Sequence, residues 1–406
     1  MQVLVFEPKF VGHFLGFALQ ASKAYARLGD QVTLAVPAQA RDSTQASVKL
    51  ANLPEGVRVE YVVDVPPGYE KQVNAPHEAR ALRECLAMRA WDRVSIPSAD
   101  FLLSGLMRDR PTRQSLRRVG ADLILHNLQQ VYSRIGKKAR LHSLWDQLAV
   151  SLAKGLELYT VDPFVSSGRT RWPAGLWSNP VHPLPHFHDR WPQAASREAA
   201  RERLGLAGDA KILGSIGDLG GRKGTELLIE SFAASRPAPR TTLALYGIMS
   251  RPAKETLARY SDLVKSGQIV TRDEFLTDEE FRLFLSAVDS IWAGFPFQIG
   301  IASTLLHAAE AKRPVIASDF GCVGWMTQTY GLGRVVPARL DAMTEAIRWF
   351  GDQSSWEIDE AGAERLLATH TTENFARELT RRWSRLRTSQ HGVADAPAAP
   401  AEGEAT

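Results

Sequence analysis

The sequence is poor in cysteine and has no long apolar run. Its 406 residues include two cysteines, Cys85 and Cys322, which lie far apart and in no metal-binding spacing. We expect packing residues in a reducing compartment rather than a disulfide or a nucleophile. No apolar run reaches the roughly 18 residues that cross a bilayer. The opening MQVLVFEPKF has no basic segment before a long apolar one. We therefore expect a first strand there rather than a signal peptide, and a cytoplasmic protein.

Positive charge is concentrated in one segment. The net charge is only +4. Between positions 108 and 140, however, Asp109 and Asp122 are the only acids beside Arg108, Arg110, Arg113, Arg117, Arg118, Arg134, Lys137, Lys138 and Arg140. Solvated helix faces would explain this run, and so would a patch that contacts an anionic substrate or anionic lipid at the inner membrane face. No nucleic-acid-binding module accompanies the charge, so we expect no nucleic-acid partner.

Strand and helix patterns alternate in two sets, which predicts two domains with mostly parallel sheets. The first set has strands at 2–7, 31–37, 57–65, 121–127 and 155–162, with a long, mostly helical segment at 70–118. The second set has strands at 210–219, 241–248, 268–275, 289–295 and 314–318. We expect domains at 1–190 and 191–370, a terminal helix at 371–389, and a disordered tail at 390–406.

The two sets are joined by a stretch rich in proline and histidine, PVHPLPHFHDRWPQA at 180–194. Proline density disfavours regular structure and is typical of a hinge. His182, His186 and His188 suggest a metal site, but the prolines leave them no defined ligand face. The sequence therefore predicts a hinge here and no metal.

A glycine-rich loop follows the predicted strand 210–219. The run GDLGGRKGTE, 217–226, holds four glycines, and its Arg222 and Lys223 stand where a helix begins. Free N–H groups at a helix start, beside two cations, are suited to a phosphate or diphosphate. A surface turn with solvated cations is the alternative.

A second loop of this kind lies in FPFQIGIASTLLHAAEAKRPVIAS, 295–318. Gly300 permits close approach of a ligand, and Ser303 and Thr304 either cap the next helix or offer hydroxyls to an anion. Two such loops on neighbouring strand ends indicate a ligand with two phosphates, such as a sugar nucleotide.

The order of these motifs resembles that of GT-B glycosyltransferases. SREAARERLGLAGDAKILGSIGDLGGRKGTELLIESF, 196–232, is similar to the start of their donor-binding domain, and LALYGI, FLTDEEFRLFLSAVDSIWAGFP and AAEAKRPVIASDFG follow at the expected distances. FVGHF and ADLILHN match the first domain more loosely, and NFARELTRRWSRL resembles the terminal helix. The chain thus resembles the large, mostly retaining, nucleotide-sugar-dependent group 1, which includes bacterial mannosyl- and glucosyltransferases.

This resemblance implies an α/β GT-B fold. Two Rossmann-like, doubly wound domains would face each other across a cleft, with the acceptor on the first and the donor on the second. The C-terminal helix would return to the first domain.

The resemblance also implies roles in the second domain. The diphosphate-binding lysine of the family falls on Lys223. Its partner arginine falls on Asp218, which follows Gly217 at the strand end and would lie near the donor sugar or nucleoside. This reverses the charge, and Arg222 could replace the missing cation from another direction.

The paired glutamates of the family are missing. They fall on Ile299 and His307, although one grips the donor ribose and the other approaches the transferred sugar in the family. Glu310, one helical turn beyond His307, is either a nearby substitute carboxylate or a solvated helix residue. The run GIASTLL also resembles the helix start of inverting nucleotide-sugar enzymes, which leaves the stereochemical course open.

In the first domain the resemblance points to Gly12 and His126, and the positions of His13 beside Gly12 and of Asp162 at a strand end add these two residues. Gly12 matches the glycine-rich loop that closes over the diphosphate, and His13 would hydrogen-bond a sugar hydroxyl or act as a base near neutrality. His126 matches the histidine near the reacting sugar, unless it is only a structural hydrogen-bonding residue. Asp162 would orient an acceptor hydroxyl or cap the next turn.

We therefore predict a glycosyltransferase that moves a sugar from a nucleotide-diphosphate sugar to a hydroxyl of a glycan, lipid-linked or small-molecule acceptor. No cofactor and no metal are expected, because cations and helix N-termini would face the phosphates. The alternatives are a catalytically silent sugar-nucleotide-binding protein of the same fold and a sugar-nucleotide epimerase on the same scaffold.

Overall fold

The structure, a computed structural model, describes residues 1–10, 13–63, 75–100, 102–126, 128, 153, 155–167, 180–191 and 195–390. Gly12, the basic residues Arg134, Lys137, Lys138 and Arg140, and the predicted tail from 391 onward lie outside the described residues. No helix in the described ranges is long and apolar enough to cross a membrane.

The first domain is built on a parallel sheet of seven strands. Their spatial order is β3 (Val57–Val63), β2 (Gln31–Pro37), β1 (Gln2–Phe6), β4 (Arg93–Ile96), β5 (Ala121–Leu125), β6 (Glu157–Thr160) and β7 (Val181–Pro183). The accompanying helices are α1 (Phe14–Ala26), α2 (Thr44–Leu50), α3 (Ala75–Ala87), α4 (Leu102–Arg108), α5 (Arg110–Val119) and the short α7 (Pro163–Ser166), with a 3-10 turn at Ala38–Asp42.

Strand β1 shows why helices cover both faces of this sheet. Successive side chains of a strand point to opposite faces, and every residue from Val3 to Phe6 is fully buried. Val3 and Val5 pack with α1 and α2, whereas Leu4 and Phe6 pack with α3, α4 and α5. Continuous apolar strands therefore predicted this doubly covered sheet correctly.

The second domain is built on a parallel sheet of six strands. Their order is β10 (Ile269–Arg272), β9 (Thr241–Tyr246), β8 (Lys211–Ile216), β11 (Ser290–Ala293), β12 (Val315–Ser318) and β13 (Gly333–Val336). Its helices are α8 (Arg197–Leu204), α9 (Thr225–Ala234), α10 (Arg251–Ala258), α11 (Ser261–Lys265), α12 (Asp278–Ala287), α13 (Ser303–Glu310), α14 (Gly321–Thr329), α15 (Leu340–Asp352) and α16 (Glu360–Thr369), with a 3-10 turn at Gly221–Lys223.

Two helix starts in this domain follow directly from sequence. The Ser196 hydroxyl accepts the Ala199 N–H at 3.2 Å to begin α8. Thr277 and Glu280 form a capping box at the start of α12. Gly205 ends α8 in the left-handed conformation, with φ of 66°.

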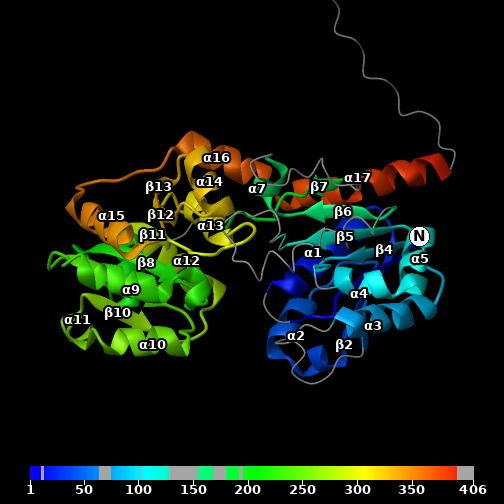
Figure 1. The fold of residues 1–406 in the computed structure, drawn as a ribbon, viewed down its shortest axis with the longest axis horizontal. Helices are drawn as coiled ribbons and strands as arrows, with labels where there is room; N and C mark the ends of the chain where they lie inside the picture. Colours follow the sequence, from blue (N-terminus) through cyan, green and yellow to red (C-terminus); the bar gives the residue numbers. More distant parts are fainter. Residues whose placement is uncertain are drawn as a thin grey trace, which may run out of the picture.

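The terminal helix α17 (Thr372–Gln390) belongs to the second half of the sequence but packs on the first domain. Figure 1 shows α16 and α17 crossing from one domain to the other. Trp383 of α17 is buried and donates its indole N–H to Asp30 at 3.0 Å. The predicted return of the C-terminal helix is therefore confirmed.

Three strands were not predicted. Strand β4 lies inside the segment predicted to be mostly helical, and it begins with the buried Arg93. Strand β7 lies in the segment predicted to be a hinge, as an edge strand ending in Pro183, and β13 has four residues. Arg93 is paired with Asp122 and Glu157, at 2.9 Å each. Asp122 lies on the adjacent strand β5 and Glu157 on β6, one strand further along the sheet. The acids that compensate the buried charge of Arg93 are therefore brought to it only by the folded sheet.

Candidate functional site

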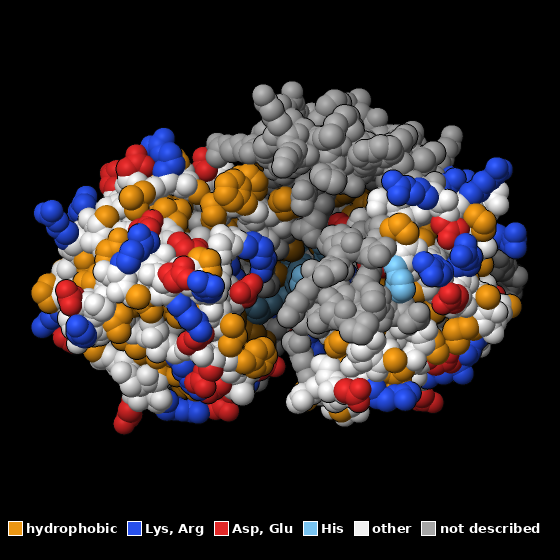
Figure 2. Space-filling model, turned by 60° about the horizontal axis from the view of Figure 1, so that its bottom comes forward, with side chains coloured by type: hydrophobic (Ala, Val, Ile, Leu, Met, Phe, Trp, Pro, Cys, Tyr) orange, Lys and Arg blue, Asp and Glu red, His pale blue; other side chains and the backbone are white. Residues whose placement is uncertain are grey.

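A cavity of about 490 Å³ lies between the two domains, at the carboxyl ends of both sheets. Figure 2 shows the two lobes with histidine side chains visible in the hollow between them. The first domain and the segment after β7 supply His13, Phe17, His126, Val161 and His186. The second domain supplies Asp218, Arg222, Lys223, Phe295 and residues 298–304. The structure thus brings both predicted phosphate loops to one cavity.

Lys223 ends the 3-10 turn that follows β8 and reaches into the cavity. Its ammonium group donates to the Ile216 carbonyl at 2.6 Å and lies 5.9 Å from the centre of the Phe295 ring. Burial, and then the nearby Arg222 charge, lower the pKa of Lys223 to about 8, against the opposing effect of Asp218. The group is therefore a partly desolvated cation, which an anionic ligand would stabilise in its charged form.

The backbone beside Lys223 requires glycine. Gly224 has a φ of 64°, and a Cβ there would lie 2.9 Å from Pro296 and 3.0 Å from the Gly294 carbonyl. Gly217 has a φ of 96° and packs against Gly247. A Cβ on Gly247 would lie 1.9 Å from the Gly217 carbonyl oxygen. Neither Gly217 nor Gly224 lines the cavity, so their role is to shape the loop that carries Lys223.

Arg222 and Asp218 share the rim of the cavity. The Arg222 guanidinium donates to the Gln298 side-chain oxygen at 3.0 Å and lies 3.9 Å from the Asp218 carboxylate. Both charged side chains are more than half exposed, so their mutual attraction is weak and Arg222 can turn to a ligand. Arg222 therefore stands where it could supply the second cation, with Asp218 beside it.

The start of α13 also faces the cavity. Residue 302 is its N-cap, and no side chain in the described part of the chain caps the helix. Ser303 and Thr304 both line the cavity, and neither acts as the cap. The alternative in which these hydroxyls merely cap the helix is therefore wrong. Backbone N–H groups and two hydroxyls meet at this helix end, which favours an anion.

Gly300 brings this loop against the first domain. Its φ is 77°, and a Cβ at this position would lie 2.7 Å from the His126 carbonyl oxygen. Its neighbour Ile299 packs on the core of the first domain, and Ile301 packs on the cores of both domains. The loop therefore closes one side of the cavity by direct contact between the domains.

His126 directly follows β5 and is 6% exposed. Its Nε2 lies 2.7 Å from the Pro97 carbonyl oxygen, and its backbone N–H donates to both Asp100 oxygens at 2.9 Å. A carbonyl oxygen only accepts, so Nε2 carries a proton, and a ring protonated at Nε2 alone keeps the lone pair of Nδ1. The two roles predicted for His126 are thus compatible, because a structural bond on one nitrogen leaves the other for chemistry.

His13 stands next to His126, with ring centres 5.6 Å apart. The His13 side chain is exposed to solvent and lines the cavity. Desolvation by the nearby atoms, followed by His126 and Arg222, lowers its pKa to about 4. His13 is therefore neutral at pH 7 and a weak base, which favours hydrogen bonding to a sugar hydroxyl over proton abstraction.

Asp162 is fully buried and does not line the cavity. Its carboxylate accepts the Phe164 N–H at 3.0 Å at the start of α7 and also interacts with the Cys322 thiol of the second domain. The predicted capping role is thus present. Burial and Asp162 together raise the pKa of Cys322, and burial raises that of Cys85 to about 12, so both thiols stay protonated.

His307 and Glu310 lie outside the cavity, in a second one of about 380 Å³. The His307 ring stacks on Trp191 with centres 4.6 Å apart, and Glu310 accepts the Trp191 backbone N–H at 2.5 Å. Ile299, at the other glutamate position, does line the first cavity. The Glu310 carboxylate therefore lies outside the first cavity.

For three cavity residues the sequence predicted no role at the cleft. Phe17 packs edge-on against His126, with ring centres 4.4 Å apart, and against His186 at 5.3 Å. Gln298 is 7% exposed, and its side-chain oxygen accepts the hydrogen bond from Arg222. His186 was assigned to the hinge, yet it lines the cavity. No motif marks these residues, because only the meeting of the domains makes them neighbours.

No family model matches the chain. TuaC from Bacillus subtilis (strain 168), whose name describes a glycosyltransferase of teichuronic acid biosynthesis, is 25% identical over 166 residues. The match covers 41% of this chain, and the chain spans only 39% of that relative.

Solved structures match nearly the whole chain. Sucrose-phosphate synthase from Thermosynechococcus elongatus has a TM-score of 0.71 at 15% identity, covering 96% of this chain and all of that one. Anabaena HepE in complex with UDP and glucose has 0.67 at 14%, covering 95% and 100%. WaaG, a glycosyltransferase involved in lipopolysaccharide biosynthesis, has 0.63 at 16%, covering 94% and 100%. The chain therefore has the GT-B fold, as its sequence predicted.

Proposed function

We propose that this protein is a glycosyltransferase that takes a sugar from a nucleotide-diphosphate sugar. The observation that carries the proposal is a single interdomain cavity in which Lys223 and the uncapped start of α13 lie together. A cation and a helix N-terminus favour the negative charge that develops on a departing diphosphate. Structural relatives that bear UDP and glucose or UDP-glucose, according to their titles, support a nucleotide sugar as the ligand.

In this proposal the second domain holds the leaving group. Lys223 contacts the diphosphate with Arg222 beside it, and the N–H groups and hydroxyls at Ser303 and Thr304 bind the remaining phosphate oxygens. These groups supply the positive charge that a divalent ion would otherwise provide, so we propose that transfer needs no metal. Asp218 would hydrogen-bond a donor hydroxyl from the rim.

The first domain would receive the acceptor. As the bond between the anomeric carbon and the diphosphate oxygen breaks, an acceptor hydroxyl bonds to that carbon and releases a proton. The lone pair on Nδ1 of His126 is the proposed proton acceptor, and His13 hydrogen-bonds a sugar hydroxyl. The products are the glycoside, the nucleoside diphosphate and a proton.

A silent sugar-nucleotide-binding protein is the second candidate. It is favoured by Ile299 and His307, which replace the carboxylates of the family that the sequence resembles. In this case the cavity would bind the donor without catalysing its turnover.

The experiment is a turnover assay on purified protein with UDP-, GDP-, dTDP- and ADP-sugars, followed by chromatography of the nucleotide and sugar products. Slow hydrolysis or transfer that releases a nucleoside diphosphate supports the transferase. Binding without release supports the silent protein, and a free epimer or nucleoside monophosphate overturns both.

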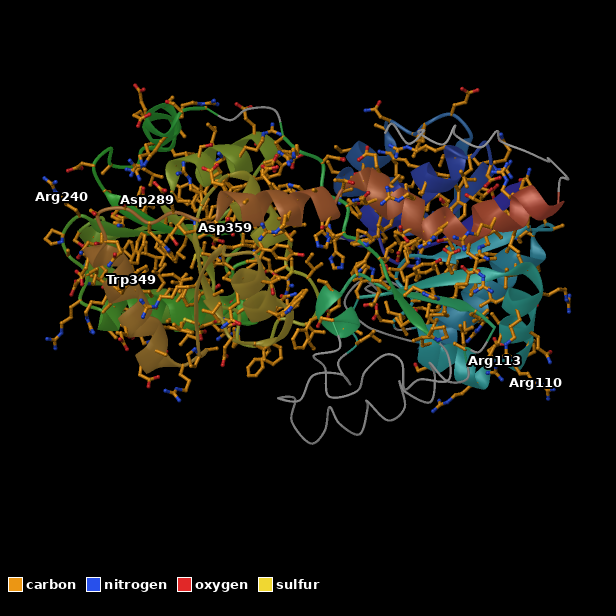
Figure 3. All side chains as sticks on the ribbon, turned by 90° about the horizontal axis from the view of Figure 1, so that it is seen from above. Arg110, Arg113, Arg240, Asp289, Trp349 and Asp359 are labelled. Carbon is orange, nitrogen blue, oxygen red and sulfur yellow. The ribbon has the colours of Figure 1, made fainter. Side chains whose placement is uncertain are left out.

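Peripheral membrane contact belongs to the same proposal. Figure 3 shows Arg110 and Arg113 at the end of the first domain that lies away from the second domain. Arg110, Arg117 and Arg118 are exposed on α5. They do not line the cavity, so we propose that they contact anionic lipid rather than the donor.

A further inference from the structure

Two histidines and a glutamate from distant parts of the chain meet behind the cleft. His188 comes from the segment after β7, and His307 and Glu310 lie three residues apart on one face of α13. One potential ligand atom from each residue lies within 4.8 Å of the other two. Neither proposed substrate site uses this cluster. His307 and Glu310 border the 380 Å³ cavity, and none of the three residues lines the cleft.

His307 has an unusual polar environment. Its Nδ1 is buried and has no hydrogen-bond partner among the described residues. A buried nitrogen without a partner is costly in an apolar setting, and an imidazole nitrogen is a common ligand of transition metals.

The surrounding contacts orient the three side chains. One oxygen of the Glu310 carboxylate accepts a hydrogen bond from His188 Nε2 at 2.8 Å. The other oxygen accepts a hydrogen bond from the Trp191 backbone N–H at 2.5 Å. The Trp191 ring stacks on His307 with an interplanar angle of 20°. The Trp191 N–H thus holds the second oxygen of Glu310, and the Trp191 ring holds the His307 imidazole in place. Contacts of this kind, outside the ligands themselves, orient the ligands of a metal site.

We propose that His188, His307 and Glu310 bind a zinc ion. Two ligand atoms about 2.1 Å from a tetrahedral ion lie about 3.4 Å apart. His188 Nε2 and Glu310, now 2.8 Å apart, would therefore separate slightly, while the His307 nitrogen, within 4.8 Å of both, would move in by about 1 Å. The His188 and His307 ring centres, 5.1 Å apart, already have a separation that suits two imidazoles on one ion. The neighbouring cavity leaves room for water as the fourth ligand.

Binding would exchange contacts without redox change. The bond between His188 Nε2 and Glu310 gives way to coordination of both atoms, and the proton on Nε2 moves to Nδ1. The Trp191 bond to Glu310 remains. Imidazole nitrogens with one carboxylate favour zinc over magnesium or calcium, which prefer oxygen ligands.

The basic residues that line the same cavity are already paired. Arg313 donates to the Ser286 carbonyl at 2.7 Å and to the Leu285 carbonyl at 3.2 Å. Lys312 pairs with Glu360 at 2.7 Å, and Arg282 lies over the Trp191 ring at 5.6 Å. Their charges therefore weaken the attraction for a cation without blocking the ligands.

Bound zinc would join the segment after β7 to α13, whose opposite end faces the cleft. The ion would thus hold Ser303 and Thr304 in place relative to the segment that connects the domains. This role is structural, and it is independent of which donor the cleft binds.

The test uses the full chain, stripped with a chelator and then equilibrated with zinc chloride. We expect about one zinc per chain by elemental analysis after desalting, and a melting temperature that rises by several degrees. H307Q and E310Q should lose both effects. H182Q is the matched control, because His182 is an exposed histidine on β7 outside the cluster, and it should keep both.

Cobalt substitution provides a readout that does not depend on a folded variant. Cobalt(II) bound to the wild-type protein should give the intense visible bands of a four-coordinate ion, and added zinc should abolish them. Absence of stoichiometric uptake by the wild type would overturn the proposal, as would equal zinc retention in H307Q and H182Q. Sugar-nucleotide turnover does not enter either measurement, so failure of the transferase proposal leaves this result separate.

Discussion

Lys223 carries most of the electrostatic argument, because it is a cation held against a carbonyl and an aromatic ring instead of water. Its pKa of about 8 lies below the ordinary value of 10.5. Between these two values the unfolded chain binds more protons than the folded one. The stability of the protein should therefore rise with pH in that window.

Donor binding should show the opposite trend. A diphosphate needs the charged form of Lys223, so we expect nucleoside diphosphate affinity to be constant between about pH 7 and 8, where the terminal phosphate is already ionised. Above about pH 8, affinity should fall by up to about tenfold per pH unit. Calorimetric titration across this range measures the effect, and K223A should remove the pH dependence. A wild-type affinity that stays flat up to pH 10 would contradict the assignment.

Substitution of Gly300 tests the contact between its loop and the first domain. In G300A the new Cβ would occupy a left-handed residue and lie 2.7 Å from the His126 carbonyl oxygen. We expect a destabilisation of roughly 1–2 kcal/mol and weaker donor binding, because the loop must move away from the first domain. Thermal denaturation measures the first effect. G208A is the control, because no atom lies within 4 Å of that position, and equal melting temperatures for the two variants would argue against the contact.

Local motifs predicted some cavity residues and missed others. Lys223 and Ser303 follow strands in loops whose glycines and hydroxyls are visible in the sequence. His186 and Gln298 have no such context, and their proximity depends on how two domains meet. The sequence also pointed to His307 as a donor contact, whereas its ring packs on Trp191 outside the cleft.

At the scale of elements, apolar periodicity predicted the long buried strands and the capped helices. It failed for β4, where the buried Arg93 interrupts the apolar pattern and depends on acids from other strands. It also failed for β7, where proline suggested a hinge but is tolerated at the end of an edge strand. Both strands form because they pair with other strands of the sheet, and this pairing is not visible in the sequence of a single segment.

The stability of the protein should depend on how helix α17 is anchored to the first domain. Trp383 is 4% exposed and bonds to the buried Asp30 of the first domain. We expect W383A to cost about 3–5 kcal/mol, through a large cavity and an acid that loses one partner. Urea denaturation followed by circular dichroism measures it. R385A, on an exposed turn of the same helix, should change stability little. Similar losses in both variants would mean that α17 does not depend on this anchor.

At the scale of the whole molecule, the basic end of the first domain lies away from the cleft. Replacing Arg110, Arg117 and Arg118 with serine should weaken binding to anionic vesicles by about 100-fold, at about 1 kcal/mol per charge. Co-sedimentation with anionic and neutral vesicles measures this. Replacing the exposed Arg240, Arg251 and Arg259 of the second domain removes the same charge elsewhere. Equal loss in both triple variants would reduce the effect to net charge.

The arrangement of two domains around one anion-binding cavity is the central claim. Calorimetric titration of the wild type, K223A and K265A with UDP, GDP, dTDP and ADP tests it most directly. Lys265 is an exposed lysine on α11 and serves as the control. We predict that one nucleoside diphosphate binds the wild type and K265A alike, and that K223A binds it about 10–100-fold more weakly. Equal affinity in all three proteins, or no binding of any nucleotide, would contradict the account.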